Sequence, residues 1–205
     1  MATVGPLAFP ESGFSGIIFD CDGTLVDSMP CHFEAWCDAL AQFGAANILK
    51  EDVFYAMGGR PSTDIVAEIN SEYDLHLDAE EVAIVKRAAF LRRLGRIEQI
   101  DEVVEFARKW SGRVPMAVAT GGSRLVIEKT LQCLGLSDLF DEVVAVEDVP
   151  NGKPAPDVYL VAAERMGVTP IHCLAVEDAP AGILAAQAAG MKVMRVPAPL
   201  SFARA

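Results

Sequence analysis

The sequence of 205 residues has few basic residues for its acidic content. Its 17 Lys and Arg stand against 29 Asp and Glu, and the formal net charge is −12. A chain this acidic repels phosphate backbones and anionic lipid surfaces, which argues against nucleic-acid partners and against membrane binding. Any function on an anionic substrate therefore requires a local positive site or a metal ion.

Paired cysteines and targeting segments are also missing. The five cysteines lie at positions 21, 31, 37, 133 and 173, and none forms a Cys-x-x-Cys pair. A zinc knuckle and a thioredoxin-like site are therefore not indicated, and scattered thiols are typical of a reducing compartment. The first residues lack a basic segment with a long apolar run, and no stretch reaches the ~18 apolar residues of a membrane helix. We expect a cytoplasmic protein.

Several catalytic signatures are absent as well. No Cys is followed six residues later by Arg, which excludes a thiol-based phosphatase. Lys153 has neither the spaced glycine before it nor the Ser or Thr after it that a Walker loop requires, and no G-x-G-x-x-G, G-x-S-x-G or H-E-x-x-H occurs. Nucleotide-binding and serine- or zinc-hydrolase chemistry of these kinds is therefore not expected.

Short apolar runs without polar alternation are present, and they are typical of strands buried on both faces of a parallel sheet. Helical patterns separate the last four runs, and this alternation predicts a doubly wound α/β core. The runs lie at 16–20, 115–120, 142–146, 173–177 and 192–196, and the helices at 124–134, 157–166 and 181–189.

Residues 30–96 interrupt this alternation. They contain no strand-like run, and the spacing of their apolar residues predicts helices at 32–43, 63–73 and 79–94. We therefore predict a core made of residues 1–29 and 97–205, with residues 30–96 inserted as a helical domain after the first strand.

Two aspartates follow the first predicted strand, in the sequence Asp20-Cys21-Asp22-Gly23-Thr24. In doubly wound sheets, ligands bind beyond the carboxyl ends of the strands. Residues i and i+2 of an extended chain point the same way, so both carboxylates can face one spot. Like charges that close together favour a bound cation, and two carboxylates without histidine suit Mg²⁺. The alternative is a helix cap or an Asx-turn, which is the commoner role of a single Asp.

Two further strand ends carry groups that can bind an anion. Thr120-Gly121 follows the second strand and offers a hydroxyl and free N–H groups at a helix N-terminus, although an ordinary capping turn has the same residues. Lys153 lies in the turn-rich loop after the third strand. A loop lysine is commonly only solvated, but this one is predicted to lie at the same sheet edge as the aspartates.

The fourth strand ends in a second acidic pair, Glu177-Asp178, which could complete a metal site or cap the following helix. The same Ala-Val-Glu-Asp sequence occurs at 145–148. Because an outer strand lies farther from the first one, we assign Glu147 and Asp148 to a structural or solvent-exposed role.

In this order and at these strand ends, Asp-x-Asp-Gly-Thr at 20–24, Thr120, Lys153-Pro154 and Glu177-Asp178 resemble the haloacid dehalogenase-like hydrolase superfamily. Segments 27–36, 152–157 and 177–182 are similar to its β-phosphoglucomutase-like branch, and segments 115–120 and 165–167 to the fructose-1-phosphatase-like members of that branch. The resemblance implies a Rossmann-like, three-layer α/β/α core with an inserted helical cap. The Pro-Gly that often marks the return from the cap is missing near 98–103, which leaves the position of the hinge open.

The resemblance also implies roles. Dehalogenases of the superfamily lack an acid at the second Asp position, so Asp22 favours phosphoryl transfer. Asp20 would be the nucleophile that forms an aspartyl-phosphate, and Asp22 the general acid and base. The implied ligands of Mg²⁺ are the Asp20 carboxylate, the Asp22 carbonyl, Asp178 and Glu177, and the phosphoryl group would be held by Thr120, Gly121 and Lys153.

The cap would select the substrate, a small phosphorylated metabolite and in particular a sugar phosphate. The cap candidates are His32, Gly59, Arg60 and Arg92, each with an alternative role as a turn or solvated surface residue. The loop around Arg60 departs from the mutase pattern, so we predict a phosphatase, with a hexose phosphate mutase as the alternative. A non-catalytic binding module is a further alternative. We expect a monomer or a weak homodimer.

Overall fold

The apolar runs predicted as strands form one parallel sheet in the computed structural model, which describes residues 7–197. The sheet order is β5-β4-β1-β6-β7, and every pairing is parallel. Its strands are β1 (Gly16–Phe19), β4 (Met116–Ala119), β5 (Glu142–Val144), β6 (Cys173–Glu177) and β7 (Lys192–Arg195). The third strand is shorter than predicted, because Val146–Asp148 forms a 3₁₀ turn (η3).

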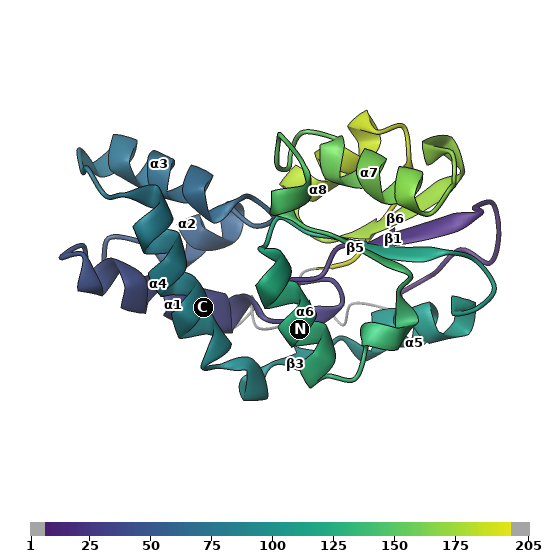
Figure 1. Cartoon of the computed structure of the whole chain (residues 1–205), viewed down its shortest axis with the longest axis horizontal. Helices are drawn as coiled ribbons and strands as arrows, with labels where there is room; N and C mark the ends of the chain where they lie inside the picture. The colour runs from purple at the N-terminus through teal and green to yellow at the C-terminus, as the bar shows by residue number, and fades with distance from the viewer. Residues whose placement is uncertain (1–6, 198–205) are drawn as a thin grey trace.

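Helices cover both faces of the sheet (Figure 1). α5 (Asp101–Trp110) and α6 (Arg124–Cys133) lie on one face, against Ile17 and Phe19 of β1. α7 (Asp157–Arg165) and α8 (Pro180–Ala188) lie on the other, against Ile18. Successive residues of β1 thus point to opposite faces. The predicted three-layer α/β/α core is confirmed. Two short 3₁₀ turns, η2 (Ser137–Leu139) and η4 (Pro170–His172), precede β5 and β6.

The inserted segment forms a second lobe of helices beside the carboxyl ends of the strands (Figure 1). It has its own apolar cluster around Trp36, Phe54 and Ile69. Its elements are α1 (Met29–Gln42), α2 (Glu51–Ala56), α3 (Ser62–Tyr73), α4 (Ala79–Leu91) and the 3₁₀ turn η1 (Leu94–Arg96). The short α2 was not predicted, and α4 ends three residues earlier than predicted. The Arg93 guanidinium donates to the Ala89 carbonyl oxygen over 2.7 Å at this end of the helix. We call this lobe the cap.

A two-stranded ribbon joins the two lobes. β2 (Val26–Asp27) pairs antiparallel with β3 (Glu98–Gln99), so the chain enters and leaves the cap side by side. The base of the cap is continuous with the core, because Cys31, Ala35, Ala89 and Phe90 belong to the apolar cluster on the α5–α6 face of the sheet. The domain boundaries at 29/30 and 96/97 stay a prediction. No helix within residues 7–197 combines the length and apolarity needed to cross a membrane.

Candidate active site

The sequence-predicted groups converge at the carboxyl edge of the sheet. Asp20 follows β1, Thr120 follows β4 and Glu177 ends β6, and these three strands are neighbours in the sheet. Lys153 reaches the same place from the loop between η3 and α7. Asp20, Thr120, Lys153 and Glu177 are 3%, 2%, 1% and 0% exposed, so these polar groups are taken out of water together. Burial of this kind is sustained only by mutual pairing.

A buried charge network connects them. Lys153 Nζ donates to Asp20 Oδ1 over 2.6 Å and to Glu177 Oε2 over 2.8 Å. Glu177 Oε1 accepts the main-chain N–H groups of Asp178 and Ala179, at 3.1 and 2.9 Å. Gly182 of α8 makes room for this carboxylate, because a Cβ at that position would overlap Glu177 Oε2. A glycine is therefore required here for close approach rather than for a turn.

The charges in this network do not balance. Burial raises the pKa of Asp20, and the Glu177 carboxylate raises it further, while Lys153 opposes both. Burial and the same Glu177 charge raise the pKa of Asp178 to about 7. Three carboxylates therefore share one ammonium group. Asp20, Glu177 and Asp178 each offer an oxygen, and these oxygens lie within 4.8 Å of one another. The donor set fits a hard divalent cation such as Mg²⁺.

Asp178 is oriented by a residue of the same Asp-x-Asp-Gly-Thr segment. Thr24 Oγ1 donates to Asp178 Oδ1 over 2.7 Å. Just before Thr24 the chain turns at Gly23, whose φ is +93°, and a Cβ there would overlap the Asp178 carboxylate. The segments that follow β1 and β6 are thus held together by this contact.

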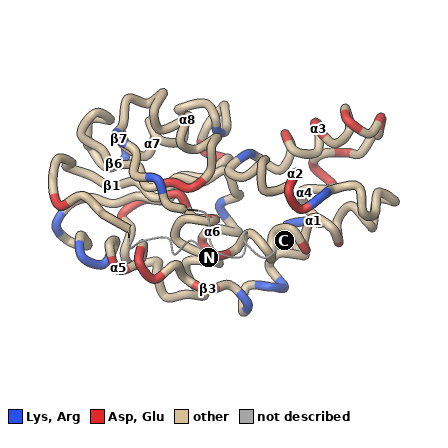
Figure 2. The backbone as a smooth tube through the Cα atoms, turned by 180° about the vertical axis from the view of Figure 1, so that it is seen from behind, with Lys and Arg blue, Asp and Glu red and all other residues tan. Residues whose placement is uncertain are grey.

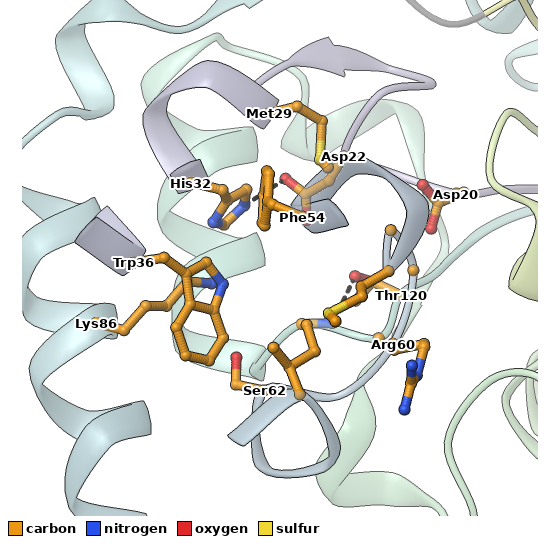
Figure 3. A pocket seen from close by; sticks show the side chains of 16 residues that line it. Asp20, Asp22, Met29, His32, Trp36, Phe54, Arg60, Ser62, Lys86 and Thr120 are labelled. Carbon is orange, nitrogen blue, oxygen red and sulfur yellow. Dashed lines mark hydrogen bonds and ion pairs between the residues drawn. The ribbon is translucent and has the colours of Figure 1, made fainter. Parts of the chain in front are cut away.

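Asp22 faces the cap. Its Oδ1 accepts hydrogen bonds from Ser28 Oγ over 2.5 Å and interacts with His32 Nε2 at 3.0 Å (Figure 3). Burial raises the pKa of Asp22, but the charge of His32 and the hydrogen bonds from His32 and Ser28 outweigh burial and lower this pKa to about 2. The carboxylate is therefore ionised near neutral pH. The His32 ring stacks on Phe90 of α4, with centroids 3.8 Å apart, so the helical lobe fixes its orientation.

The Thr120 loop closes against the cap. Thr120 Oγ1 accepts the N–H of Gly122 over 2.9 Å, which shapes the turn into α6. A Cβ at Gly121 would overlap the Gly59 carbonyl oxygen, and one at Gly152 would overlap the Pro61 ring. The cap loop 58–62 therefore contacts both the Thr120 loop and the Lys153 loop through glycine positions that admit no larger residue.

These contacts enclose a pocket between the lobes (Figure 3). Asp20, Asp22 and Thr120 form its core side. Its cap side is mostly apolar, with Met29, Trp36, Phe54, Met57 and Ile65 joined by Ser62 and Lys86. Lys86 Nζ lies 5.6 Å from the ring centroid of Trp36 and 5.9 Å from that of Phe90. Burial lowers the pKa of this lysine to about 8.

The cap candidates differ in where the structure places them. His32, Gly59 and Arg60 line the pocket, but Arg60 Nη1 donates to Glu68 over 2.5 Å and its guanidinium points away from the two aspartates (Figure 3). Arg92 is exposed and is not among the residues that line this pocket, because it follows the end of α4, beyond the buried face of that helix.

Ser28, Lys86 and Tyr159 are among the polar residues at the site that were not predicted. Lys86 had a signal in the sequence, because it lies four residues after the buried Val82 and four before the buried Phe90, on one helix face. Tyr159 and Ser28 had none, since each acts on a carboxylate that only the fold brings near. The other Glu-Asp pair, Glu147-Asp148, is structural: Asp148 binds Arg124 and Arg165, and Glu147 Oε2 accepts the Arg124 main-chain N–H over 3.0 Å.

Comparisons with known proteins show the family and the fold. The family model described as haloacid dehalogenase-like hydrolase matches residues 14–190. The fructose-1-phosphate phosphatase YqaB of Escherichia coli is 40% identical over 189 residues, covering 89% of this chain and 96% of that protein. Hexitol phosphatase A of E. coli is 33% identical, covering 92% and 86%. The crystal structure of CbbY from Rhodobacter sphaeroides in complex with phosphate matches with a TM-score of 0.81 at 22% identity, covering 91% and 87%, and supports the fold.

Proposed function

The chain belongs to the haloacid dehalogenase-like hydrolases, and from this premise we infer that it is a Mg²⁺-dependent phosphatase of small phosphorylated carbohydrates. The observation that carries the proposal is the buried Asp20, whose carboxylate is hydrogen-bonded to Lys153. It lies beside the acidic pair Glu177-Asp178, and it lines a pocket between the core and the cap. A carboxylate that is both desolvated and paired in this way is suited to attack phosphorus.

In the proposed first half-reaction, an Asp20 carboxylate oxygen forms a bond to phosphorus while the bond from phosphorus to the sugar oxygen breaks. Asp22 gives a proton to that leaving oxygen. The product is an aspartyl-phosphate on Asp20 and a free sugar. Lys153, Thr120 and the Gly121 N–H would hold the phosphoryl oxygens, since phosphoryl transfer depends mainly on positioning and on charge stabilisation.

In the second half-reaction, water attacks the phosphorus, Asp22 takes a proton from it, and Asp20 is released with inorganic phosphate. Ser28 and His32 keep Asp22 ionised, so the carboxylate is free to accept that proton. For the acid role the carboxylate must first take up a proton. The negative charge of a bound phosphate favours that step by raising the pKa of Asp22.

The residues that would hold Mg²⁺ are Asp20, Glu177, Asp178 and the main-chain carbonyl of Asp22. Bound there, the ion offsets the repulsion between the Asp20 carboxylate and the phosphate oxygens. The lysine at the site cannot do this alone, because its single positive charge is already shared among three carboxylates, two of them buried.

The substrate proposal combines the relatives with the pocket. The E. coli relative is named a fructose-1-phosphate phosphatase, and a hexitol phosphatase is also similar. Arg60 is paired with Glu68. Among residues 7–197, this leaves Lys86 as the lysine or arginine of the cap that faces the pocket without a carboxylate partner of its own. This arrangement favours a sugar monophosphate, and it argues against a mutase, which must seat the second phosphate of a bisphosphate intermediate.

Other partners are not proposed. Acidic stretches lie on both lobes, including α3, in keeping with the net charge of −12 (Figure 2). We propose a cytoplasmic enzyme, because all five cysteines are free. A monomer or weak homodimer stays a prediction.

Phosphate release from a panel of sugar monophosphates, with Mg²⁺ and with EDTA, tests the proposal. We expect Mg²⁺-dependent release that Asp20→Asn reduces by several orders of magnitude. Near-normal turnover by Asp20→Asn would contradict the covalent mechanism. Purified, folded protein that releases no phosphate under any condition would favour a binding module. Incubation with β-glucose 1-phosphate and a bisphosphate primer tests the mutase alternative, which predicts glucose 6-phosphate with little free phosphate.

A further inference from the structure

Tyr159 lies on α7 beneath the site, outside every sequence segment that the proposed mechanism uses. It is completely buried, and its hydroxyl donates to Glu177 Oε2 over 2.7 Å. The ammonium of Lys153 lies over the same ring, 5.0 Å from its centroid. One side chain therefore contacts both partners of the buried Lys153–Glu177 pair.

The position of Lys153 depends on a competition between two carboxylates. Its Nζ lies 2.6 Å from Asp20 Oδ1 and 2.8 Å from Glu177 Oε2. The oxygen of Glu177 that accepts from Lys153 is also the one that accepts from Tyr159. A second donor on that oxygen stabilises part of its negative charge and so weakens its hold on the ammonium. The Tyr159 hydroxyl thus leaves Lys153 available to Asp20.

We propose that Tyr159 is a positioning residue of this phosphatase: its hydroxyl fixes Glu177 and, through it, places Lys153 between Asp20 and the phosphoryl group. The proposal rests on the phosphatase function inferred above. Without the hydroxyl, the Glu177 oxygen keeps Lys153 as its remaining side-chain donor and draws it away from Asp20. Transition-state stabilisation suffers more than ground-state binding, because charge on the phosphoryl oxygens is still developing when Lys153 is needed.

Tyr159→Phe removes only the hydroxyl and keeps the ring. We expect kcat to fall about tenfold and KM for the sugar phosphate to change less than threefold, as for the loss of one hydrogen bond used in the transition state. Tyr73→Phe is the matched control. It also removes one hydroxyl hydrogen bond, here to the Ile48 carbonyl oxygen at 3.0 Å, but on the surface of the cap. We expect its kcat to equal that of the wild type.

A double-mutant cycle separates positioning from packing. If Tyr159 acts through Glu177, Tyr159→Phe lowers kcat much less in a Glu177→Gln background than in the wild type. A purely structural role predicts a lower Tm with additive effects on kcat. Mn²⁺ binding without substrate, followed by water-proton relaxation, gives a readout independent of turnover, and we expect Tyr159→Phe to bind the ion severalfold more weakly because Glu177 is less firmly held.

A kcat within twofold of the wild type for folded Tyr159→Phe overturns the proposal, and so does full additivity with Glu177→Gln. Tyr159→Met, which fills the space with a flexible apolar chain, serves as the second variant and must show the same fall in kcat. Failure of the function itself looks different, because the wild type and Tyr73→Phe would then both be inactive.

Discussion

At the scale of single residues, Lys86 gives the cap side of the pocket a positive charge whose pKa is lowered by its surroundings. Its ammonium lies over Trp36 and Phe90 in a pocket with a mostly apolar roof. The titratable groups on the facing elements are Asp22, which favours the ammonium, and His32, whose own pKa is lowered by burial and by Lys86. Burial outweighs the attraction of Asp22 and lowers the pKa of Lys86 to about 8, so the amine is charged below that pH and neutral above it.

We therefore expect kcat/KM for a sugar phosphate to fall as the pH rises through about 8, because the cap then loses its positive charge. Lys86→Arg stays charged and moves this fall to higher pH, whereas Lys86→Met raises KM about tenfold at pH 7 and shows no such fall. The measurement is the pH profile of kcat/KM. Lys129→Met, on the exposed side of α6, is the control and leaves the profile unchanged. An unaltered alkaline limb in Lys86→Met would contradict this assignment.

Gly182 provides a second residue-scale prediction. A Cβ here would overlap Glu177 Oε2, so Gly182→Ala must displace the carboxylate that holds Lys153. We expect the free energy of unfolding to fall by about 1–3 kcal/mol, as for other overpacked sites. We also expect at least a tenfold loss of kcat.

Gly95→Ala is the matched control, because no atom lies within 4 Å of its added Cβ. Urea unfolding and steady-state kinetics of the two variants compare them directly. Equal stability and activity of Gly182→Ala and the wild type would show that the close approach is not needed.

At the scale of elements, the cap loop 58–62 and the Lys153 loop approach each other tightly at Gly152 and Pro61. A Cβ at Gly152 would overlap the Pro61 ring, so Gly152→Ala keeps the two loops apart. We expect kcat/KM for the sugar phosphate to fall about tenfold, because the pocket no longer closes around the substrate.

Pro61→Ala removes the ring carbons that the new methyl would meet, so the double variant should recover most of the lost kcat/KM. Pro61→Ala alone is the control for the loss of the proline itself. If the double variant is no better than Gly152→Ala, the defect arises within the Lys153 loop rather than between the loops.

The elements also show what the sequence could predict. Buried parallel strands are apolar throughout, so β1, β4 and β6 were recognisable, and with them the side chains at their carboxyl ends. α5 carried a helical signal in Val103, Val104 and Ala107 but lay outside the predicted elements. The six-residue α2 and the two-residue strands β2 and β3 are too short to show a period, so no pattern could place them.

The site residues likewise divide into those that the sequence predicts and those that it does not. Asp20, Asp22, Lys153, Glu177 and Asp178 follow from their places at strand ends. Tyr159 and the pairing of Arg60 with Glu68 depend on distances between elements, which sequence spacing does not encode.

At the scale of the whole molecule, the apolar cluster of the core extends into the base of the cap through Cys31, Ala35, Ala89 and Phe90. The two lobes therefore share buried surface, and unfolding one exposes part of the other. Each lobe also contains one of the two tryptophans, Trp36 in the cap and Trp110 in α5.

We expect the lobes to unfold together in urea. Trp110→Phe leaves fluorescence from the cap and Trp36→Phe leaves fluorescence from the core. In each variant the fluorescence midpoint should coincide with the midpoint measured by far-ultraviolet circular dichroism. This comparison within one variant is independent of any stability that the substitution itself removes. A cap fluorescence midpoint at lower urea than the dichroism midpoint of the same variant would show a separately unfolding cap.

The β2–β3 ribbon has a consequence for how such an enzyme changes over evolutionary time. Because both junctions of the insertion lie side by side, replacement of everything between them leaves the path of the remaining chain unaltered. A lineage can therefore exchange its substrate preference as a block while inheriting the chemistry intact. The same property offers a design rule for chimaeras, in which a foreign cap is grafted between the two ribbon strands. The recipient should keep its own residues where the core packs against the insertion, at Cys31, Ala35, Ala89 and Phe90.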